Sequence, residues 1–418
     1  MKNVLIVSPF FPLPLISGGH QAIFNGIACL EGVANVFLVY TTTESKFKKV
    51  EKKAIREKLP FVKCVPYINP LSRHNMAWVY KCVLNKLKDS CFVSWILPKQ
   101  SEAKLVNTKK NGVPNIEIAL LSEGFQKHVL SLIKKYQIDI VQMEMIETIR
   151  LVDVLPVEIR KVFVHHEIRW VRNDLLIGRV DVSEDTRKRV VELKQEEIGY
   201  LNRCDRIIVL SETDKKKLQQ EGVKTEILTS FAVVNGKVCS FVAQAENSHQ
   251  LSYVGPSDHY PNYDGVMWFL RNCWHRLLDV SPEFELQIIG RWDEFIMNEI
   301  MNEYKNVRFL GFVEDLGQVL QGSIEIVPLN IGSGIRMKIL EAARLGVPVV
   351  STSVGAEGLP LMDGKDILIA DNAADFVGAI CKLQDWELRK RLVTSMQQNI
   401  LPMYSIEALE NNRKPVYE

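Results

Sequence analysis

Short apolar runs alternate with longer polar segments of helical spacing through the first half of the chain. Apolar runs of this length, bounded by polar residues, predict buried strands, and the segments between them predict helices. The expected strands are 4–8, 36–41, 138–142, 162–165, 206–210 and 226–228, and the first helix is expected over about 19–31. This βαβ order predicts a doubly wound parallel sheet.

Periodicity fades between residues 229 and 250, where polar residues accumulate, and the same alternation then starts again. The second set of expected strands is 251–255, 285–290, 307–311, 324–329, 349–352 and 367–370, with a helix over 264–278. We therefore expect an α/β protein with two Rossmann-like, doubly wound parallel-sheet domains, 1–235 and 236–390, that face a central cleft. Residues 391–418 are expected to form a C-terminal helix or tail, for which packing against the first domain is one option.

Composition narrows the class of protein. The chain has 418 residues, enough for more than one domain, and its net charge of +2 gives no sign of a nucleic-acid partner. Its eight cysteines are scattered without paired spacing, which favours reduced thiols in a cytoplasmic protein. No metal site is expected. Lys2 and the apolar run 4–16 resemble a signal peptide, but Pro9, Pro12 and Pro14 interrupt that run, which favours a first strand followed by a loop.

Residues 46–110 depart from the regular alternation. A lysine-rich stretch, 47–59, is followed by aromatic residues interleaved with lysines over 73–110. Such interleaving suits a membrane surface or a lipid-linked acceptor. A solvated helix face with its aromatic residues in the core explains the pattern more simply. Peripheral membrane contact through 46–110 is therefore retained as one option.

A glycine-rich loop follows the expected strand 324–329 and carries two cations. Gly332 and Gly334 open the loop, and Arg336 and Lys338 come directly after them. Ligands bind at the carboxyl ends of strands in open parallel sheets, and a glycine turn exposes backbone N–H groups at the positive end of the next helix. The planar guanidinium and the lysine ammonium both suit a diphosphate. This loop is therefore predicted to bind a phosphorylated ligand.

The helix after this loop supplies further candidates. Glu341 lies one to two turns into it, where a carboxylate can accept hydrogen bonds from ribose hydroxyl groups. Gly346 is placed to end the helix in the left-handed conformation. A second glycine turn, 355–358, then follows the next strand, with Gly355 and Glu357 as candidate donor-binding residues.

The first half of the chain offers two features for the opposite wall of the cleft. Gly18 and Gly19 open the first helix directly after the first strand, which leaves bare backbone at a helix N-terminus. His165 and His166 end the strand 162–165, and strand alternation aims the two side chains to opposite faces. Only one of them can face the cleft. His166 is the first candidate and His165 the alternative.

Two segments, YVGPSDHYPNYDGVMWF (253–269) and IVPLNIGSGIRMKILEAARLGVPVVSTSVGAEGL (326–359), resemble the nucleotide-sugar domain of retaining GT-B glycosyltransferases of family 4. The resemblance implies the GT-B fold. It also implies that Glu341 is the second glutamate of the family's paired-glutamate motif and holds the nucleotide ribose. The first glutamate is missing, and Arg336 and Lys338 are expected to take over contact with the diphosphate. His166 matches the family's cleft histidine.

The resemblance implies transfer of a sugar from a nucleoside-diphosphate sugar to a hydroxyl of a glycan or lipid-linked acceptor, in cell-surface polysaccharide synthesis. No cofactor and no metal are expected, and the location is cytoplasmic, with the inner face of the membrane as an option. His166, Arg336 and Lys338 are the expected catalytic residues. The expected donor-binding residues are Gly18, Gly19, Gly332, Gly334, Arg336, Lys338, Glu341, Gly355 and Glu357. Two alternatives stay open: a nucleotide-sugar epimerase on the same fold, for which the histidine pair would supply acid and base, and a non-catalytic nucleotide-sugar-binding relative, suggested by the missing glutamate.

Overall fold

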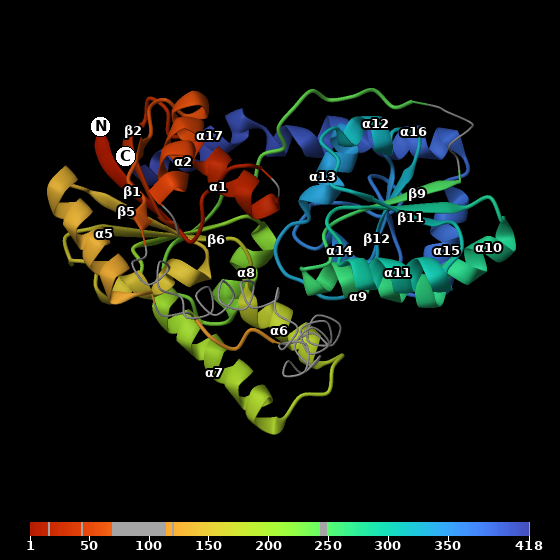
Figure 1. The fold of residues 1–418 in the computed structure, drawn as a ribbon, viewed down its shortest axis with the longest axis horizontal. Coiled ribbons are helices and arrows are strands. Elements are labelled where there is room, and N and C mark those ends of the chain that lie inside the picture. The colour runs from red at the N-terminus through yellow and green to blue at the C-terminus, as the bar shows by residue number, and fades with distance from the viewer. Residues whose placement is uncertain (16, 43–44, 69–113, 119–120, 243–248, 418) are drawn as a thin grey trace, which may run out of the picture.

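The computed structural model describes residues 1–15, 17–42, 45–68, 114–118, 121–242 and 249–417. Two α/β domains lie side by side, each with helices on both faces of a central sheet (Figure 1). None of the helices in the described ranges is long and apolar enough to cross a membrane. Most of the segment 46–110 lies outside the described residues, so membrane contact through it stays a prediction.

All strand pairs of the first sheet are parallel, in the order β3-β2-β1-β5-β6-β7-β8, with β4 beside β2. Its strands are β1 (Lys2–Ser8), β2 (Ala34–Thr42), β3 (Lys63–Cys64), β4 (Tyr67–Ile68), β5 (Ile140–Glu144), β6 (Arg160–His165), β7 (Arg206–Val209) and β8 (Ile227–Thr229). Its helices include α1 (Gly18–Ala28), α2 (Ser45–Lys58), α5 (Glu123–Tyr136), α6 (Arg169–Ile177), α7 (Glu184–Leu201) and α8 (Glu212–Gln220).

Serine side chains begin four helices of this domain. Ser17, Ser122, Ser183 and Ser211 precede α1, α5, α7 and α8, and each hydroxyl oxygen accepts a hydrogen bond from the N–H three residues later. The first N–H groups of a helix lack partners inside the helix, and this bond satisfies one of them. The serines thereby fix where each helix begins, including α1 at the cleft.

The second sheet is also parallel and has the order β11-β10-β9-β12-β13-β14. Its strands are β9 (Gln250–Val254), β10 (Glu285–Ile289), β11 (Val307–Gly311), β12 (Ile324–Val327), β13 (Val349–Ser351) and β14 (Leu368–Ile369). The helices are α9 (Tyr260–Phe269), α10 (His275–Val280), α11 (Glu294–Glu303), α12 (Leu316–Leu320), α13 (Met337–Arg344), α14 (Ser353–Ala356), α15 (Ala373–Lys382) and α16 (Trp386–Ser395). This is the doubly wound nucleotide-binding order, in which the chain reverses direction across the sheet between β9 and β12.

The expected elements are confirmed. Every strand predicted from the apolar runs overlaps an observed strand, with ends that differ by at most two residues. Gly346 takes the predicted left-handed conformation after α13, with φ of 78°. Both doubly wound parallel-sheet domains are likewise present. Their carboxyl strand ends are where ligands bind in such sheets.

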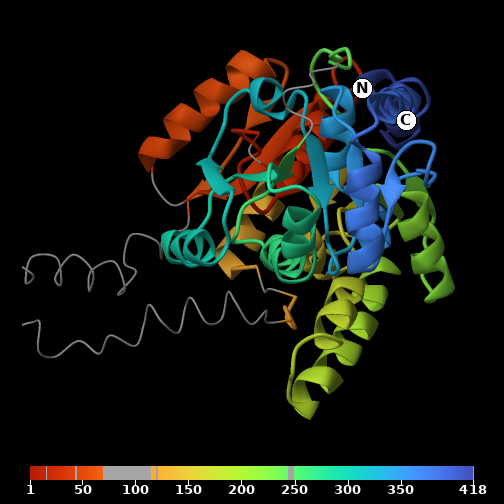
Figure 2. The same cartoon turned by 90° about the vertical axis from the view of Figure 1, so that its right-hand side faces the viewer.

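The last helix, α17 (Ile406–Tyr417), lies on the first domain although it follows the second in sequence. Leu409, Val416 and Tyr417 are buried in the same hydrophobic cluster as Val4 and Ile6 of β1. The two chain ends are close together in both ribbon views (Figures 1 and 2). The C-terminal segment therefore connects the two domains a second time.

Candidate functional site

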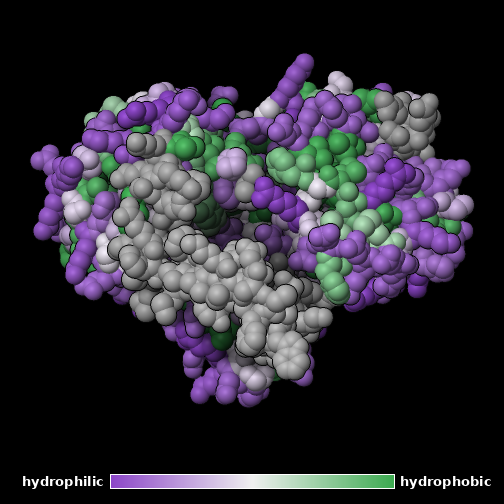
Figure 3. Space-filling model, in the orientation of Figure 1, coloured by the Kyte–Doolittle hydropathy of each residue, from purple (hydrophilic) through white to green (hydrophobic). Residues whose placement is uncertain are grey.

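The N-termini of α1 and α13 approach each other from opposite domains. A Cβ atom built on Gly18 would lie 3.1 Å from the Cγ of Met337, the first residue of α13. A Cβ on Gly19 would lie 2.6 Å from the methyl group of Met145. Glycine at these positions therefore allows close approach, and the molecular surface is hollowed between the domains (Figure 3). Two helix N-termini make this region favourable for anions.

The glycine loop before α13 contacts the first domain directly. Gly334 has φ of 75°, and a Cβ there would lie only 2.6 Å from the backbone oxygen of His166. Ser333 Oγ accepts a hydrogen bond of 2.9 Å from the N–H of Ile168. The loop that was predicted to bind a phosphorylated ligand therefore lies against the end of β6, where the candidate histidine is.

Arg336 folds back over its own loop. Its Nη1 donates to the backbone oxygens of Ser333 at 2.7 Å and Gly334 at 2.6 Å. Gly332 has φ of 151°, a conformation that favours glycine, and a Cβ there would collide with this guanidinium. Burial lowers the pKa of Arg336 from its ordinary value, and the nearby carboxylates of Glu357 and Glu167 oppose this shift. The guanidinium thus orders the loop and places a positive charge beside it.

Lys338 is held between polar and aromatic groups rather than extending into solvent. Its Nζ lies 3.2 Å from Asn262 Oδ1 and 4.1 Å from the centroid of the Tyr253 ring. Burial lowers the pKa of this lysine, Glu325 raises it in part, and Arg336 lowers it further. The two expected diphosphate ligands, Arg336 and Lys338, are therefore partly buried cations near one another.

Glu325 is a component of the site that the sequence analysis did not single out. It lies fully buried on β12, where its carboxylate accepts hydrogen bonds from Ser252 Oγ at 2.8 Å and from the N–H of Val254 at 3.0 Å. Burial raises its pKa, and the charge of Lys338 opposes this rise. The signal available in the sequence was one glutamate inside the apolar run 324–329, because a buried carboxylate needs partners.

The remaining expected donor-binding residues are engaged with protein groups. Glu341 Oε2 pairs with Arg344 Nε at 2.8 Å, and Glu357 Oε1 pairs with Lys217 Nζ of the first domain at 3.1 Å. The N–H of Gly355 donates to Thr352 Oγ1 at 2.9 Å. Glu341 lies in the middle of α13, and Gly355 and Glu357 lie at the end of α14, so none of the three is in the glycine loop.

The two histidines occupy different environments, as strand alternation requires. His166 Nε2 lies 2.6 Å from Glu144 Oε2, and its Nδ1 has no hydrogen-bond partner among the described residues although it is buried. His165 Nε2 lies 2.8 Å from Glu197 Oε1, inside the first domain. The structure brings His166, and not His165, to the glycine loop through its backbone oxygen.

Glu144 and Glu197 were also missed from sequence. Both are fully buried, and each is paired with a histidine many residues away. Glu144 ends the apolar strand β5 and Glu197 lies within the charged helix α7. Nothing in either local pattern identifies a distant histidine as the partner.

The arrangement supports anion stabilisation and hydroxyl recognition. Two helix N-termini, a guanidinium and an ammonium surround the place predicted for a diphosphate. The unpartnered Nδ1 of His166 adds a hydrogen-bonding atom from the opposite domain. In the described part of the chain, no three His, Cys, Asp or Glu side chains form a candidate metal-binding group.

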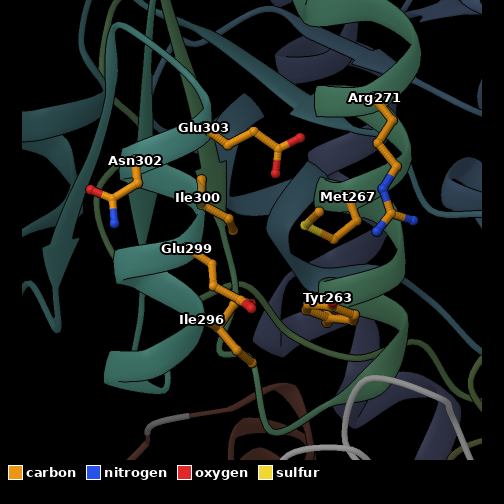
Figure 4. A pocket seen from close by; sticks show the side chains of 8 residues that line it. All are labelled: Tyr263, Met267, Arg271, Ile296, Glu299, Ile300, Asn302 and Glu303. Carbon is orange, nitrogen blue, oxygen red and sulfur yellow. The ribbon is translucent and has the colours of Figure 1, made fainter.

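A separate cavity of about 660 Å³ lies between α9 and α11 (Figure 4). Met267 and Arg271 line one side of it, and Ile296 and Ile300 line the other. None of the predicted site residues lines this cavity. Its mixed apolar and charged lining does not match the cationic loop at the cleft.

Comparison with known proteins shows similarity to glycosyltransferases. Residues 248–385 match the family model described as glycosyl transferases group 1. A protein of Klebsiella pneumoniae, described as an uncharacterized 44.6 kDa protein in the cps region, is 28% identical over 123 residues. That match covers 28% of this chain and 32% of the relative, so it spans about a third of the relative's length.

Solved structures extend the likeness to the whole chain. Staphylococcus aureus TarM is similar with a TM-score of 0.68 and 11% identity, over 100% of this chain and 99% of TarM. Sucrose-phosphate synthase of Thermosynechococcus elongatus is similar with a TM-score of 0.69 and 15% identity, over 100% of this chain and 98% of the synthase. Anabaena Alr3699/HepE, solved with UDP and glucose, is similar with a TM-score of 0.63 and 10% identity, over 100% of this chain and 99% of Alr3699/HepE. At these identities the likeness shows the fold, which is GT-B.

Proposed function

Because its second domain matches the family model of group 1 glycosyltransferases and the whole chain has the GT-B fold, we propose that this protein is a retaining glycosyltransferase. It moves a sugar from a nucleoside-diphosphate sugar to a hydroxyl of a glycan or a lipid-linked acceptor. The donor binds on the second domain and the acceptor reaches it from the first. The reaction belongs to cell-surface polysaccharide synthesis.

The observation that carries this proposal is the position of Arg336 and Lys338 on the glycine loop, with His166 of the other domain against that loop. Negative charge builds on the diphosphate as it leaves the sugar. Fixed cations and N–H groups stabilise that charge more strongly in the transition state than in the bound substrate, which accelerates the reaction. His166 Nδ1 is buried and has no hydrogen-bond partner among the described residues, and we propose that it accepts a hydrogen bond from a sugar hydroxyl of the bound substrate.

We further propose that transfer needs no metal and no cofactor. Arg336 and Lys338 supply the positive charge that neutralises the leaving diphosphate. Glu341 is proposed to hold the nucleotide ribose after exchanging its contact with Arg344 for the two hydroxyl groups. Gly355 and Glu357 complete the donor side, and Gly18 and Gly19 bring the N-terminus of α1 to the phosphates.

The comparisons support the substrate class and the setting. Alr3699/HepE was solved with UDP-glucose, and TarM with UDP and α-GlcNAc-glycerol. The Klebsiella relative belongs to a cps region, and another structural neighbour, 14% identical, is a lipopolysaccharide outer core galactosyltransferase. The cysteines within the described ranges are free thiols, which is consistent with the cytoplasmic location that we propose. Contact with the inner face of the membrane belongs to the same proposal.

Titration calorimetry with UDP and GDP tests the proposal. Arg336→Ala is expected to weaken binding of the preferred nucleotide by roughly 10- to 100-fold, because hydrogen bonds to charged groups contribute about 1.5–3 kcal/mol each. Arg308→Ala is the matched control, since Arg308 is an exposed arginine paired with Glu285 on the far edge of the same domain. Equal binding to wild type and Arg336→Ala would contradict the proposed donor site.

Product analysis separates the two alternatives. The protein is incubated with a nucleotide sugar, with and without an acceptor panel. The mass and the anomeric configuration of the products are then measured. An acceptor with one added sugar in the retained configuration supports the proposal. Isomerised donor without acceptor would instead identify an epimerase, and binding without any turnover would identify a non-catalytic relative.

A further inference from the structure

A chain of hydrogen bonds runs from the C-terminal helix to His166. The Tyr417 hydroxyl donates to Gln142 Oε1, and Gln142 Nε2 donates to Glu144 Oε1. The other carboxylate oxygen, Glu144 Oε2, lies 2.6 Å from His166 Nε2. Tyr417, Gln142 and Glu144 are buried, and 9% of the His166 side chain is exposed. The series links α17, β5 and the end of β6.

Packing alone does not account for Glu144. Its side chain is fully buried at the end of β5, which lies between β1 and β6 in the parallel sheet. A carboxylate in such a place is costly unless it is paired, and an apolar residue of similar size would fit at lower cost. Both oxygens of Glu144 instead receive a donor, one from Gln142 and one from His166.

This pairing sets the protonation of the imidazole ring. A carboxylate only accepts, so Nε2 of His166 must carry the hydrogen. In the neutral ring, Nδ1 then carries no hydrogen and has a lone pair that can accept a hydrogen bond. Nδ1 is also the ring atom without a hydrogen-bond partner among the described residues. The backbone oxygen of His166 lies against the glycine loop, so the ring belongs to the wall of the cleft that faces this loop.

We propose that Glu144, Gln142 and Tyr417 are positioning residues that hold His166 in the Nε2–H tautomer, so that Nδ1 accepts a hydrogen bond from a substrate hydroxyl. The C-terminal helix is thereby part of the active site. This inference rests on the proposed function for its kinetic consequences, and its structural part stands without it.

Contacts of Arg413 with the first domain hold Tyr417 in place. Arg413, one turn earlier on α17, donates from Nε to Ser230 Oγ at 3.0 Å. Its guanidinium occupies the space beside Gly26 of α1, where any Cβ would collide with it. These contacts fix α17 on the first domain. Tyr417 then orients the Gln142 amide, because a donor at Oε1 leaves Nε2 to face Glu144.

The tautomer is measured by NMR of full-length protein with ¹⁵N-labelled histidine, with His166 assigned by its loss in His166→Gln. Wild type is expected to show Nε2 protonated and Nδ1 unprotonated. In Glu144→Gln the new amide has one oxygen, which can accept from Gln142, and one NH₂ group, which can donate to His166 Nε2. The hydrogen of the ring then moves to Nδ1, so signals of the Nδ1–H form should appear. Tyr417→Phe frees the Gln142 amide to rotate away from Glu144, which loosens the carboxylate that holds Nε2–H, so the His166 signals should shift in the same direction but by less.

Tyr404→Phe is the matched control, because Tyr404 is also buried and its hydroxyl has no hydrogen-bond partner within the described ranges. It is expected to leave the His166 signals and the rate unchanged.

In donor turnover, Glu144→Gln should lower kcat by about 100-fold and Tyr417→Phe by roughly 3- to 10-fold, with KM for the donor nearly constant, since a positioned histidine contributes about 10²–10⁴-fold.

The outcomes separate the two proposals. Unchanged His166 signals in Tyr417→Phe, or in a folded Glu144→Gln, would overturn the positioning role whatever the activity. Shifted signals with kcat equal to wild type would overturn it as well. If wild type binds no nucleotide sugar while the signals still shift in the variants, the proposed function fails and the tautomer assignment survives.

Discussion

Ser333 Oγ accepts a hydrogen bond from the backbone N–H of Ile168, and the two atoms are 2.9 Å apart. Ser333 belongs to the glycine loop of the second domain, and Ile168 follows the candidate histidine of the first. Both residues are buried. The bond therefore joins the two walls of the cleft at the point where the donor phosphates are expected. The described structure is accordingly a closed arrangement of the domains.

Ser333→Ala should favour opening of the cleft. The variant leaves the Ile168 N–H without a partner while the domains are closed, which costs about 1–3 kcal/mol, and water satisfies that group when they open. Small-angle scattering should show a larger radius of gyration for Ser333→Ala than for wild type. Ser131→Ala, which removes an exposed hydroxyl from α5, is the control. Identical scattering curves for all three proteins would refute the role of this bond.

Gly334→Ala should impair donor binding through contact with the opposite domain. Gly334 has φ of 75°, and its Cβ would lie 2.6 Å from the backbone oxygen of His166. Gly364 is a matched control because its φ is 72° and nothing lies within 4 Å of its Cβ position. Both alanine variants should lose about 1 kcal/mol of unfolding free energy in urea, since both adopt the left-handed conformation.

Only Gly334→Ala is expected to weaken UDP binding, by about tenfold or more if the clash costs at least 1.4 kcal/mol. Calorimetric titration of both variants measures this difference. Comparable losses of affinity in Gly334→Ala and Gly364→Ala would mean that backbone strain, and not contact between the domains, determines binding.

The fold could be predicted because its signals are local. The run 4–8 is apolar and bounded, so it specifies a buried strand without reference to the rest of the chain. Gly346 ends α13 in the left-handed conformation because a helix stops most easily at glycine. The strand order then follows from right-handed crossovers, which leave few alternatives. These rules explain why two doubly wound sheets were expected.

The electrostatic network of the site could not be predicted in the same way. Glu144 meets His166 and Glu197 meets His165 across different elements, and Glu325 lies in the sheet beneath Lys338. Periodicity tells which residues share a face, but not which distant side chain completes a buried pair. The cleft loop was identified because glycines and cations gather there in sequence. The carboxylates that hold it are dispersed.

Removal of divalent metal should leave the reaction intact. Arg336 and Lys338 lie at the glycine loop, and we propose that their charges act on the diphosphate as a metal ion does in other enzymes. Transfer or donor hydrolysis in EDTA is expected to stay within about twofold of the rate in magnesium. A rate that disappears in EDTA and returns on addition of magnesium or manganese would show that this expectation is wrong.

Donor binding should weaken as the pH rises, because the diphosphate favours the charged form of Lys338. Burial lowers the pKa of Lys338 to about 7, so the lysine loses its proton far below its ordinary range. Above that pH, UDP must bind together with a proton, and the dissociation constant should rise by up to about tenfold for each pH unit. Calorimetry between about pH 6 and about pH 9, in buffers of different ionisation enthalpy, measures both the affinity and the proton uptake.

Glu325→Gln tests the cause of this dependence. The carboxylate of Glu325 raises the pKa of Lys338, so its removal should lower that pKa further and move the onset of weak binding to lower pH. Lys338→Met should remove the pH dependence and bind weakly throughout, because no group remains to take up the proton. Glu285→Gln should behave as wild type, because Glu285 is at the start of β10, where its carboxylate pairs with the exposed Arg308. If Glu325→Gln and wild type show the same dependence of UDP affinity on pH, another group binds the proton. The reason is that loss of the Glu325 charge must change the pKa of Lys338.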